Sequence, residues 1–437
     1  MSTLKVNKIR DTSGSSDAIT LDPNGGAVLA GVTTISTARV TSGIVTNTFI
    51  VGAGVTISES GIEASGIGIT CANINGAQIG GRRNIIINGD CRIAQRGTSA
   101  TSVSGQYKTV DRFSTAFGGA DEAPTEALHG LSTSDTPYAL GFRKSFHYTN
   151  GNQTSGAGSS DYLQPQYKIE AQDLATSGWD YTSSTSFITL SFWVKSSVAG
   201  DYTLNIGTHD GTAYRYFMEY TLVADTWKHV VFKIPGNSNL TVNKDNGHGA
   251  TIMWYPFLGS DYVQADQENN WYASSNSKYG TTSTTNWWTT NDSTWEITGV
   301  QLEVGSQATA FEHRSYQEEL HLCKRYYQQY PEGPTADNYN CVPSAIMACN
   351  NTTTAYYCPT LNPTMRSDPT FSSSGNFRMN GTASVNNVAV TAIGVYHNGA
   401  ATPFQYASVA SGLTAGQAVA LSVNNDATAY IAYSAEL

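Results

Sequence analysis

Charge is scarce in this sequence. Only 13% of its 437 residues are charged, against about a quarter in an average globular protein. The formal net charge is −10, so the concentrated basic surface that phosphate binding requires is missing, and no nucleic-acid partner is expected. Val, Ile, Thr and the 25 tyrosines favour strands, whereas disordered chains are rich in charge and poor in aromatic residues. We therefore predict a mainly β protein.

Long apolar runs are also missing. The uncharged stretch 40–58 contains Thr, Ser, Asn and Gly throughout, which excludes a transmembrane helix. Residues 1–20 have no apolar core of signal-peptide length. We therefore expect synthesis in a cytoplasm and no insertion into a membrane.

Cysteine pairs and enzymatic motifs are lacking as well. The six cysteines form no C-x-x-C pair, so neither a zinc site nor a thioredoxin-like site is expected. Cytoplasmic synthesis favours free, buried thiols, although Cys341, Cys349 and Cys358 are close enough in sequence to suggest a disulfide. The sequence contains no G-x-S-x-G, H-E-x-x-H, P-loop or dinucleotide-binding glycine motif. We predict no catalytic residue, metal or cofactor.

Two motifs frame the middle of the chain. The opening motif comprises residues 84–99 (NIIINGDCRIAQRGTS) and 110–113 (VDRF). The closing motif comprises residues 299–306 (GVQLEVGS), 309–316 (TAFEHRSY) and 323–328 (CKRYYQ). Together they resemble the receptor-binding region of bacteriophage tail fibres, especially those of marine phages. The resemblance covers roughly residues 83–330 and is dense, ordered and correctly spaced.

This resemblance implies an elongated homotrimeric fibre in the virion tail, made in the host cytoplasm. It implies partners of two kinds: a tail or adaptor protein at the N-terminus, and a host-surface glycan or lipopolysaccharide. Two alternatives stay open, namely a glycan depolymerase tailspike and a connector or decoration fibre with no receptor role. A hydrolase would need paired carboxylates, for which Asp261, Asp266 and Glu268 are candidates.

The N-terminal part divides into two predicted segments. Residues 1–24 alternate polar and apolar positions around turn sequences and are interpreted as a tail-attachment module. Residues 25–82 repeat short apolar pairs, as in 31–36 (GVTTIS) and 54–58 (GVTIS). One chain cannot bury so thin an apolar edge, and such repeats usually stack on copies of themselves. This pattern predicts a trimeric β-repeat shaft.

Residues 83–314 are predicted to form one large antiparallel β-sandwich. Apolar and polar residues alternate in four clear strand candidates, at 187–195, 201–206, 214–222 and 227–234, with Gly or Asp turns between them. This series resembles the jelly-roll, carbohydrate-binding-module-like domains of phage fibres.

A helix and a small β-unit are predicted to follow the sandwich. Within residues 315–334, Ser315 and Glu318 form a capping-box pair that starts a helix over 315–330, and prolines end it. The heptad spacing predicts that four residues of this helix face a trimer axis: Tyr316, Leu320, Cys323 and Tyr327. Packing against the sandwich of the same chain is the competing arrangement. Residues 335–437 contain no lysine and are predicted to form a C-terminal β-tip with strands at 388–396, 417–423 and 429–433.

The tryptophans suggest a recognition site. All eight lie between residues 179 and 295, and Trp193 and Trp227 occur in strand patterns typical of a core. Three aromatic pairs are instead interpreted as lying in loops rich in Asn, Ser, Thr and Gly, namely Trp254-Tyr255, Trp271-Tyr272 and Trp287-Trp288. Ring faces there could cover a sugar while amides bind its hydroxyls. We predict a surface groove for glycan formed by Trp271, Tyr272, Trp287, Trp288, Asp261 and Asn286. A trimer interface, also rich in Trp and Tyr, is the alternative. In that case the receptor site would lie in the C-terminal tip at residues 335–437, since the distal end of a fibre meets the cell first.

Overall fold

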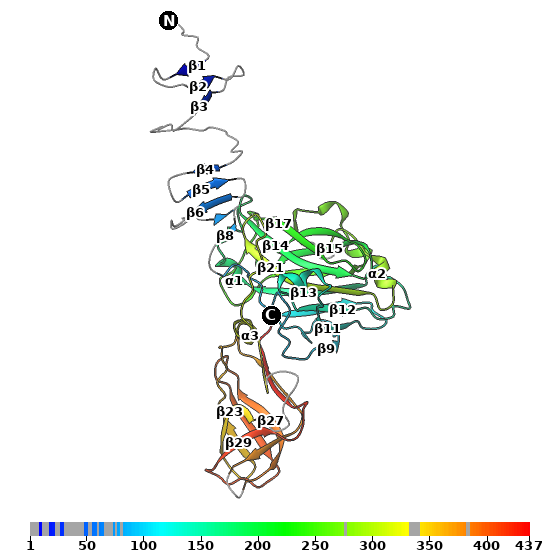
Figure 1. The fold of residues 1–437 in the computed structure, drawn as a ribbon. Coiled ribbons are helices and arrows are strands. Elements are labelled where there is room, and N and C mark those ends of the chain that lie inside the picture. The colour runs from blue at the N-terminus through cyan, green and yellow to red at the C-terminus, as the bar shows by residue number, and fades with distance from the viewer. Residues whose placement is uncertain are drawn as a thin grey trace. The chain divides into compact units, whose positions relative to one another are not determined.

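The computed structural model describes residues 82–274, 278–331, 341–381 and 385–437, together with short N-terminal strands (Figure 1). The chain divides into two compact units, Met1–Cys71 and Ala72–Leu437. In the first unit β1 (Lys8–Arg10), β2 (Asp17–Leu21) and β3 (Ala27–Leu29) form one antiparallel sheet, and β4 (Thr48–Ile50), β5 (Val55–Ser58) and β6 (Gly61–Ala64) form another. In the second, β7 (Asn73–Ile74) pairs with β8 (Ala77–Gln78). The predicted attachment module at 1–24 and shaft at 25–82 otherwise lie outside the described residues.

Two antiparallel sheets form the large domain that was predicted as a sandwich. The seven-stranded sheet has the order β10 (Phe113–Gly118), β13 (Tyr162–Glu170), β18 (His248–Tyr255), β15 (Gly200–Thr208), β16 (Tyr214–Leu222) and β20 (Trp271–Ala273), and β19 (Phe257–Leu258) pairs with β13. The six-stranded sheet has the order β17 (Lys228–Pro235), β14 (Phe187–Ser196), β21 (Thr294–Val304), β12 (Lys144–Thr149), β11 (Thr125–Gly130) and β9 (Ser99–Thr101). The four predicted strands correspond to β14, β15, β16 and β17. The mainly β, antiparallel fold is therefore confirmed.

Alternation along the strands places one core between the sheets. In β15 the side chains of Tyr202, Leu204 and Ile206 are buried in the main hydrophobic cluster, whereas Thr203 and Asn205 point to the opposite face of the sheet. The helices within the described residues are short: η1 (Thr136–Leu140), α1 (Ala171–Ala175), η2 (Ser260–Tyr262), η3 (Ala265–Gln267), α2 (Thr285–Thr289) and α3 (Tyr316–Lys324). None of them is both long and apolar enough to cross a membrane.

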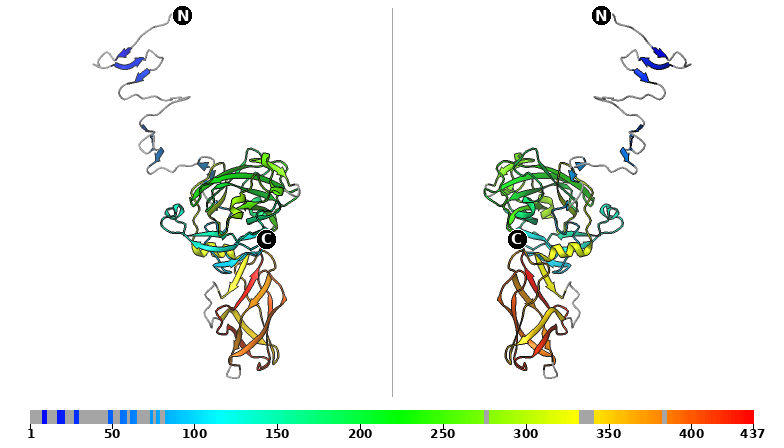
Figure 2. Two further views of the ribbon diagram at one scale, coloured as in Figure 1. Left: turned by 90° about the vertical axis from the view of Figure 1, so that its right-hand side faces the viewer. Right: turned by 90° about the vertical axis from the view of Figure 1, so that its left-hand side faces the viewer.

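The predicted C-terminal β-tip is a closed barrel (Figure 2). Its strands follow the order β23 (Cys341–Cys349), β24 (Thr354–Tyr357), β28 (Phe404–Val409), β27 (Val388–His397), β26 (Phe377–Asn380) and β29 (Ala418–Val423). A separate three-stranded sheet has the order β22 (Tyr327–Tyr330), β30 (Tyr430–Ser434) and β25 (Thr370–Ser374). The strands predicted at 388–396, 417–423 and 429–433 match β27, β29 and β30.

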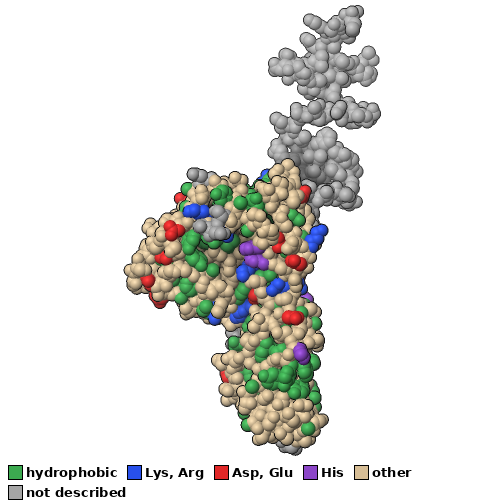
Figure 3. All heavy atoms as spheres, turned by 180° about the vertical axis from the view of Figure 1, so that it is seen from behind, with side chains coloured by type: hydrophobic (Ala, Val, Ile, Leu, Met, Phe, Trp, Pro, Cys, Tyr) green, Lys and Arg blue, Asp and Glu red, His purple; other side chains and the backbone are tan. Residues whose placement is uncertain are grey.

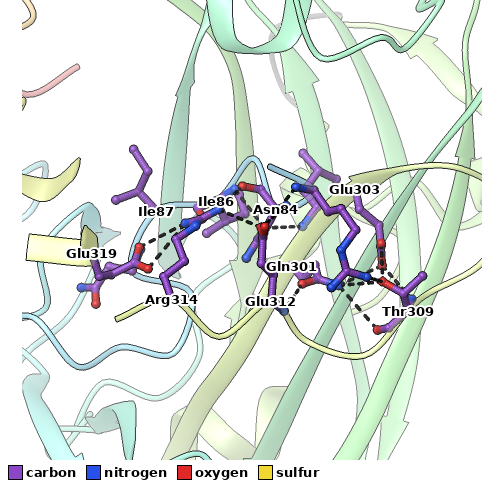
Figure 4. A network of polar contacts seen from close by, with 12 residues as sticks. Asn84, Ile86, Ile87, Gln301, Glu303, Thr309, Glu312, Arg314 and Glu319 are labelled. Atoms are coloured by element: carbon purple, nitrogen blue, oxygen red, sulfur yellow. Dashed lines mark hydrogen bonds and ion pairs between the residues drawn. The ribbon is translucent and has the colours of Figure 1, made fainter. Parts of the chain in front are cut away.

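The opening and closing motifs meet in one buried polar network (Figure 4). The side-chain amide of Asn84 donates to Val300 O, and its carbonyl accepts from Leu302 N, so the opening motif is fixed to β21. Arg314 donates to the backbone carbonyls of Asn84 and Ile86 and forms an ion pair with Glu319 at 3.3 Å. The residues that carry the resemblance therefore fix the segments before and after the sandwich strands to each other and to β21.

Two arginines of the opening motif hold the last residues of the chain. Arg112, whose side chain is only 1% exposed, pairs with the carboxylate of Glu436 and stacks over Tyr326 at 3.4 Å from the ring centroid. Arg96 lies 3.0 Å from the other oxygen of Glu436 and stacks over Tyr327 at 3.6 Å. The ion pairs thus attach the segment after β30 to the sandwich, and the ring stacking attaches Tyr326 and Tyr327, where β22 begins.

Helix α3 is shorter than predicted, and its buried apolar residues pack within the same chain instead of along a trimer axis. Ser315 does cap it, since its hydroxyl accepts from Glu318 N at 3.2 Å, but the helix ends at Lys324. The aromatic residues that follow favour a strand, and β22 pairs with β30. Leu320 and Cys323 are buried against Ile87 and Ile93 of the same chain, the competing arrangement.

The other two residues that were predicted to face a trimer axis, Tyr316 and Tyr327, are not buried together with Leu320 and Cys323. Tyr327 lies in β22 and is 7% exposed, and Tyr316 is 53% exposed. The axial placement of Leu320, Cys323 and Tyr327 is therefore wrong, whereas the homotrimer stays a prediction. Of the cysteines that the structure describes, Cys91, Cys323 and Cys349 are free and buried as expected, and Cys358 is free but exposed.

Candidate functional site: a tyrosine-lined cavity beside the seven-stranded sheet

The tryptophans that were predicted to line a surface groove are buried in the core of the sandwich. Trp287 and Trp288 are 0% and 1% exposed and belong to the main hydrophobic cluster. Helix α2 inserts them between other parts of the sandwich, where the Trp287 indole donates to Thr294 O and the Trp288 indole to Gly156 O, each at 3.0 Å. Their polar neighbours in sequence lie on the exposed side of this one-turn helix. The prediction that these rings bind glycan at the surface is wrong.

The other predicted groove residues are scattered. Trp271 is 7% exposed, and its indole donates to Pro235 O at 2.7 Å, so it too is a core residue. Tyr272 is half-buried beside Phe217, and Asn286 is exposed on α2. Asp261 is exposed, accepts a hydrogen bond from the Ser159 hydroxyl at 2.8 Å, and directly precedes a residue of the cavity described next.

A cavity of about 120 Å³ opens beside the outer face of the seven-stranded sheet, where the loop after β19 approaches it. We call it the tyrosine cavity. It is lined by Tyr162, Gln164, Tyr255, Leu258, Tyr262 and Tyr279. The first two come from β13, the next two from β18 and β19, Tyr262 from η2, and Tyr279 from the segment before α2. Residues far apart in sequence therefore build one site.

Backbone pairing fixes the two loops that carry Tyr262 and Tyr279. The amide of Tyr279 donates to Tyr262 O at 2.9 Å, and the amide of Gln264 donates to Gly280 O at 2.8 Å. Gly280 is required because a Cβ there would lie 2.4 Å from the methyl group of Thr203 on β15. The loops are thus held closely against the sheet.

The rings of the cavity meet edge to face. Tyr262 lies 5.8 Å from Tyr162 and 5.5 Å from Tyr279, with interplanar angles of 89° and 81°. The Arg215 guanidinium covers the Tyr279 ring at 4.2 Å. Such contacts restrict the rotamers of the rings before any ligand arrives. The site is therefore largely preformed.

The polar groups of the cavity are neutral donors and acceptors. The Tyr255 hydroxyl donates to the Gln164 carbonyl oxygen at 3.1 Å, and the Gln164 amide donates to Gln166 at 2.8 Å. Burial raises the pKa of Tyr255, and burial together with the neighbouring tyrosines raises that of Tyr162, so both phenols keep their protons. With no carboxylate among the lining residues, the cavity is suited to holding a neutral ligand rather than to moving protons.

Of the candidate acids for hydrolysis, Asp261 and Glu268 are not among the residues that line this cavity. Glu268 is exposed and lines a different depression together with Glu219, while the side chain of Asp266 lies outside the described residues. Among the residues that the structure describes, no group of three or more His, Cys, Asp or Glu is placed to hold a metal ion.

The solved structures that match this chain resemble it distantly. No protein-family model matches the sequence, and neither does any curated protein. A candidate sugar-binding protein from Bacteroides thetaiotaomicron matches 51% of this chain and 99% of its own, at 13% identity and a TM-score of 0.27. A structure described as CBM4 matches 50% of this chain and 97% of its own, at 13% identity and a TM-score of 0.26.

A third solved structure is the family 11 carbohydrate-binding module from Clostridium thermocellum, in complex with a β-1,3-1,4-mixed-linked tetrasaccharide. It matches 50% of this chain and 99% of its own, at 12% identity and a TM-score of 0.21. These TM-scores are too low to support a function for this chain, so a function has to rest on the geometry of its own residues.

The tyrosine cavity is not among the sites predicted from the sequence, because two of its rings come from loops and a third from a strand that resembles a loop in sequence. Tyr255 was grouped with Trp254 as a loop pair, yet both belong to β18, with Trp254 at 0% exposure in the core and Tyr255 on the opposite face. Residues 250–255 (ATIMWY) are almost all apolar, which indicates a buried strand but not which of its side chains faces the cavity. No such signal exists for Tyr262 and Tyr279, because loop pairing brings them to the site.

Proposed function

We propose that this protein is a receptor-binding bacteriophage tail fibre whose sandwich holds a host-surface glycan in the tyrosine cavity. The observation that carries the glycan part is the preformed, uncharged group of tyrosine rings with an amide at its edge. Ring faces cover the apolar C–H surface of a pyranose, and the phenols and the Gln164 amide supply hydrogen bonds to its hydroxyls. The opening and closing motifs support the tail-fibre part through their resemblance.

The proposal includes a homotrimer attached to the tail through residues 1–24, with the virion tail as its location. Its mechanism is adhesion without cleavage. At about 120 Å³ the cavity is smaller than the pockets of roughly 300–1,000 Å³ that enclose drug-sized ligands, so one copy is expected to bind weakly. Three copies on a fibre convert weak contacts into firm attachment, because each further contact forms at high effective concentration.

Removing one ring of the tyrosine cavity is expected to weaken glycan binding about tenfold. Tyr262→Ala and Tyr279→Ala serve as the test, since both side chains are half-buried and neither belongs to the main core. Binding is measured on a printed array of bacterial surface glycans, followed by titration of the strongest glycan. Tyr316→Ala, which removes a 53% exposed tyrosine elsewhere, is the matched control. Equal binding by all three variants, or no glycan bound at all, would contradict the proposed site.

The native mass of the full chain is expected to be that of a trimer. The repeats at 31–36 and 54–58 require partner chains for burial, so deletion of residues 25–82 should shift the mass towards the monomer. Deletion of residues 1–24 is the control and should leave the trimer intact while abolishing attachment to phage particles. A monomeric full chain would refute the fibre assembly.

A further inference from the structure

The C-terminal barrel carries a second group of aromatic rings on its outer face, which we call the tyrosine platform. It consists of Tyr356 on β24, Tyr396 on β27, and Phe404 and Tyr406 on β28. Along β28 the half-buried rings alternate with the buried side chains of Gln405 and Ala407, so the rings face outwards. In Figure 3 hydrophobic side chains, a class that there includes tyrosine, gather on the barrel beside a histidine.

The rings of the platform form a contiguous surface. The centroid of Tyr396 lies 4.8 Å from Tyr406, 5.4 Å from Tyr356 and 5.6 Å from Phe404, and the last pair is stacked at 28°. Tyr356 also lies 5.4 Å from Phe404. Tyr396 remains 50% exposed despite these contacts. Mutual packing therefore orders the rings while a ring face stays accessible.

Gly394 allows this arrangement. It pairs with Tyr406 across β27 and β28, and a Cβ at this position would lie 2.6 Å from Cζ and the hydroxyl oxygen of Tyr406. Any larger residue would displace the ring. The Tyr406 ring thus lies over the β27 backbone, next to Tyr396.

The polar edge of the platform is uncharged. The Asn350 amide donates to the Tyr356 hydroxyl at 3.3 Å, and that hydroxyl lies 3.5 Å from the Tyr396 hydroxyl. Residues 341–437 contain five residues with formal charge, and none lies on β24, β27 or β28. A charged ligand would find no counter-ion on these strands, whereas a neutral ligand rich in hydroxyl groups finds ring faces, phenols and an amide.

We propose that the tyrosine platform is a second glycan-binding surface, which takes neutral hexose chains. A second copy of the chain is the competing occupant. Stable protein interfaces involve about 20–30 residues a side, whereas here four rings are flanked by Asn350, Thr354 and Ser408. The site shares no residue with the tyrosine cavity, so either proposal can fail while the other holds. Two sites on one chain would raise the avidity for a repeating polysaccharide.

The test is titration of the full chain with cellohexaose, maltohexaose and mannohexaose by calorimetry. We expect at least one of them to bind, and we expect Tyr396→Ala to weaken that binding about tenfold. Gly394→Ala should also weaken it, because the Tyr406 ring must move. Tyr396→Phe keeps the ring face and should retain most of the affinity. Ile346→Ala, which trims a 71% exposed residue of β23 on the same barrel, should change nothing.

Three results would overturn the proposal. The first is that none of the three hexaoses binds. The second is equal affinity of the Tyr396→Ala and Ile346→Ala variants, which would place binding elsewhere. The third is a change in native mass caused by Tyr396→Ala, which would make the platform a contact between copies. Tyr279→Ala, measured in the same titrations, separates the platform from the tyrosine cavity.

Discussion

Arg314→Met is expected to lower the free energy of unfolding of the sandwich by about 3–5 kcal/mol, because it removes one partner of a buried ion pair. Arg314 is 8% exposed and donates to two backbone carbonyls of the opening motif as well as to Glu319. Burial raises the pKa of Glu319, and Arg314 is one of the groups that oppose this rise. Without the guanidinium, the two carbonyls lose this donor, and the buried Glu319 carboxylate loses its ion-pair partner while keeping the hydrogen bond from the Asn88 amide.

The measurement is urea unfolding followed by tryptophan fluorescence, which reports on the sandwich because all eight tryptophans lie between residues 179 and 295. Arg143→Met is the matched control, since this exposed arginine also donates to two carbonyls, those of Tyr138 and Phe142. We expect it to cost less than about 1 kcal/mol. Arg314→Lys should recover only part of the loss, because an ammonium lacks the planar fork. Similar losses for Arg314→Met and Arg143→Met would contradict this account.

The network around Arg314 also explains why the two motifs occur together. Asn84 lies 228 residues before Glu312 and 230 residues before Arg314 in sequence, yet it exchanges hydrogen bonds directly with both. Each motif requires the other, because losing one would leave buried polar groups of the other without hydrogen-bond partners. The residues that carry the resemblance to tail fibres therefore stabilise the fold, and the proposed glycan sites consist of other residues.

The sequence predicted strands well wherever a strand has one apolar face. The candidate at 214–222 has the same bounds as β16, and the barrel strand predicted at 388–396 is one residue shorter than β27. Alternation reports burial directly, because successive side chains point to opposite faces. The prediction that α3 faces a trimer axis was wrong, because heptad spacing over so short a helix does not determine which surface the helix packs against. Leu320 and Cys323 contact Ile87 and Ile93, which lie far away in sequence.

The tyrosine cavity could not be predicted in the same way. Tyr162 and Tyr255 occupy outward strand positions, but their neighbours Tyr262 and Tyr279 arrive through loop pairing that leaves no periodic trace. The platform differs in this respect. Alternation places Phe404 and Tyr406 on one face of β28, but the sequence would turn that aromatic face inwards and Gln405 outwards, the reverse of what the structure shows. The contribution of Gly394 depends on strand register.

Trp288→Ala is expected to cost about 3–5 kcal/mol of sandwich stability through the cavity it leaves, and Trp287→Ala a similar amount. Trp288 stacks on Phe257 at 4.8 Å, and the amide of Asn150 fixes the adjacent backbone by donating to Trp288 O at 2.7 Å. The half-buried Trp193 is the control, and its replacement by Ala should cost less. Urea unfolding followed by circular dichroism measures all three variants, since the change itself removes a fluorophore.

The double variant Trp287→Ala, Trp288→Ala should leave the sandwich unfolded or aggregated at room temperature, because two such cavities would consume most of the 5–15 kcal/mol or so that stabilises a typical domain. A loss of glycan binding in this variant would therefore report a loss of fold. Tyr279→Ala separates the two effects, since it should lose affinity while keeping its unfolding midpoint close to that of the unmodified chain. A folded double variant that no longer binds glycan would instead return the recognition site to α2.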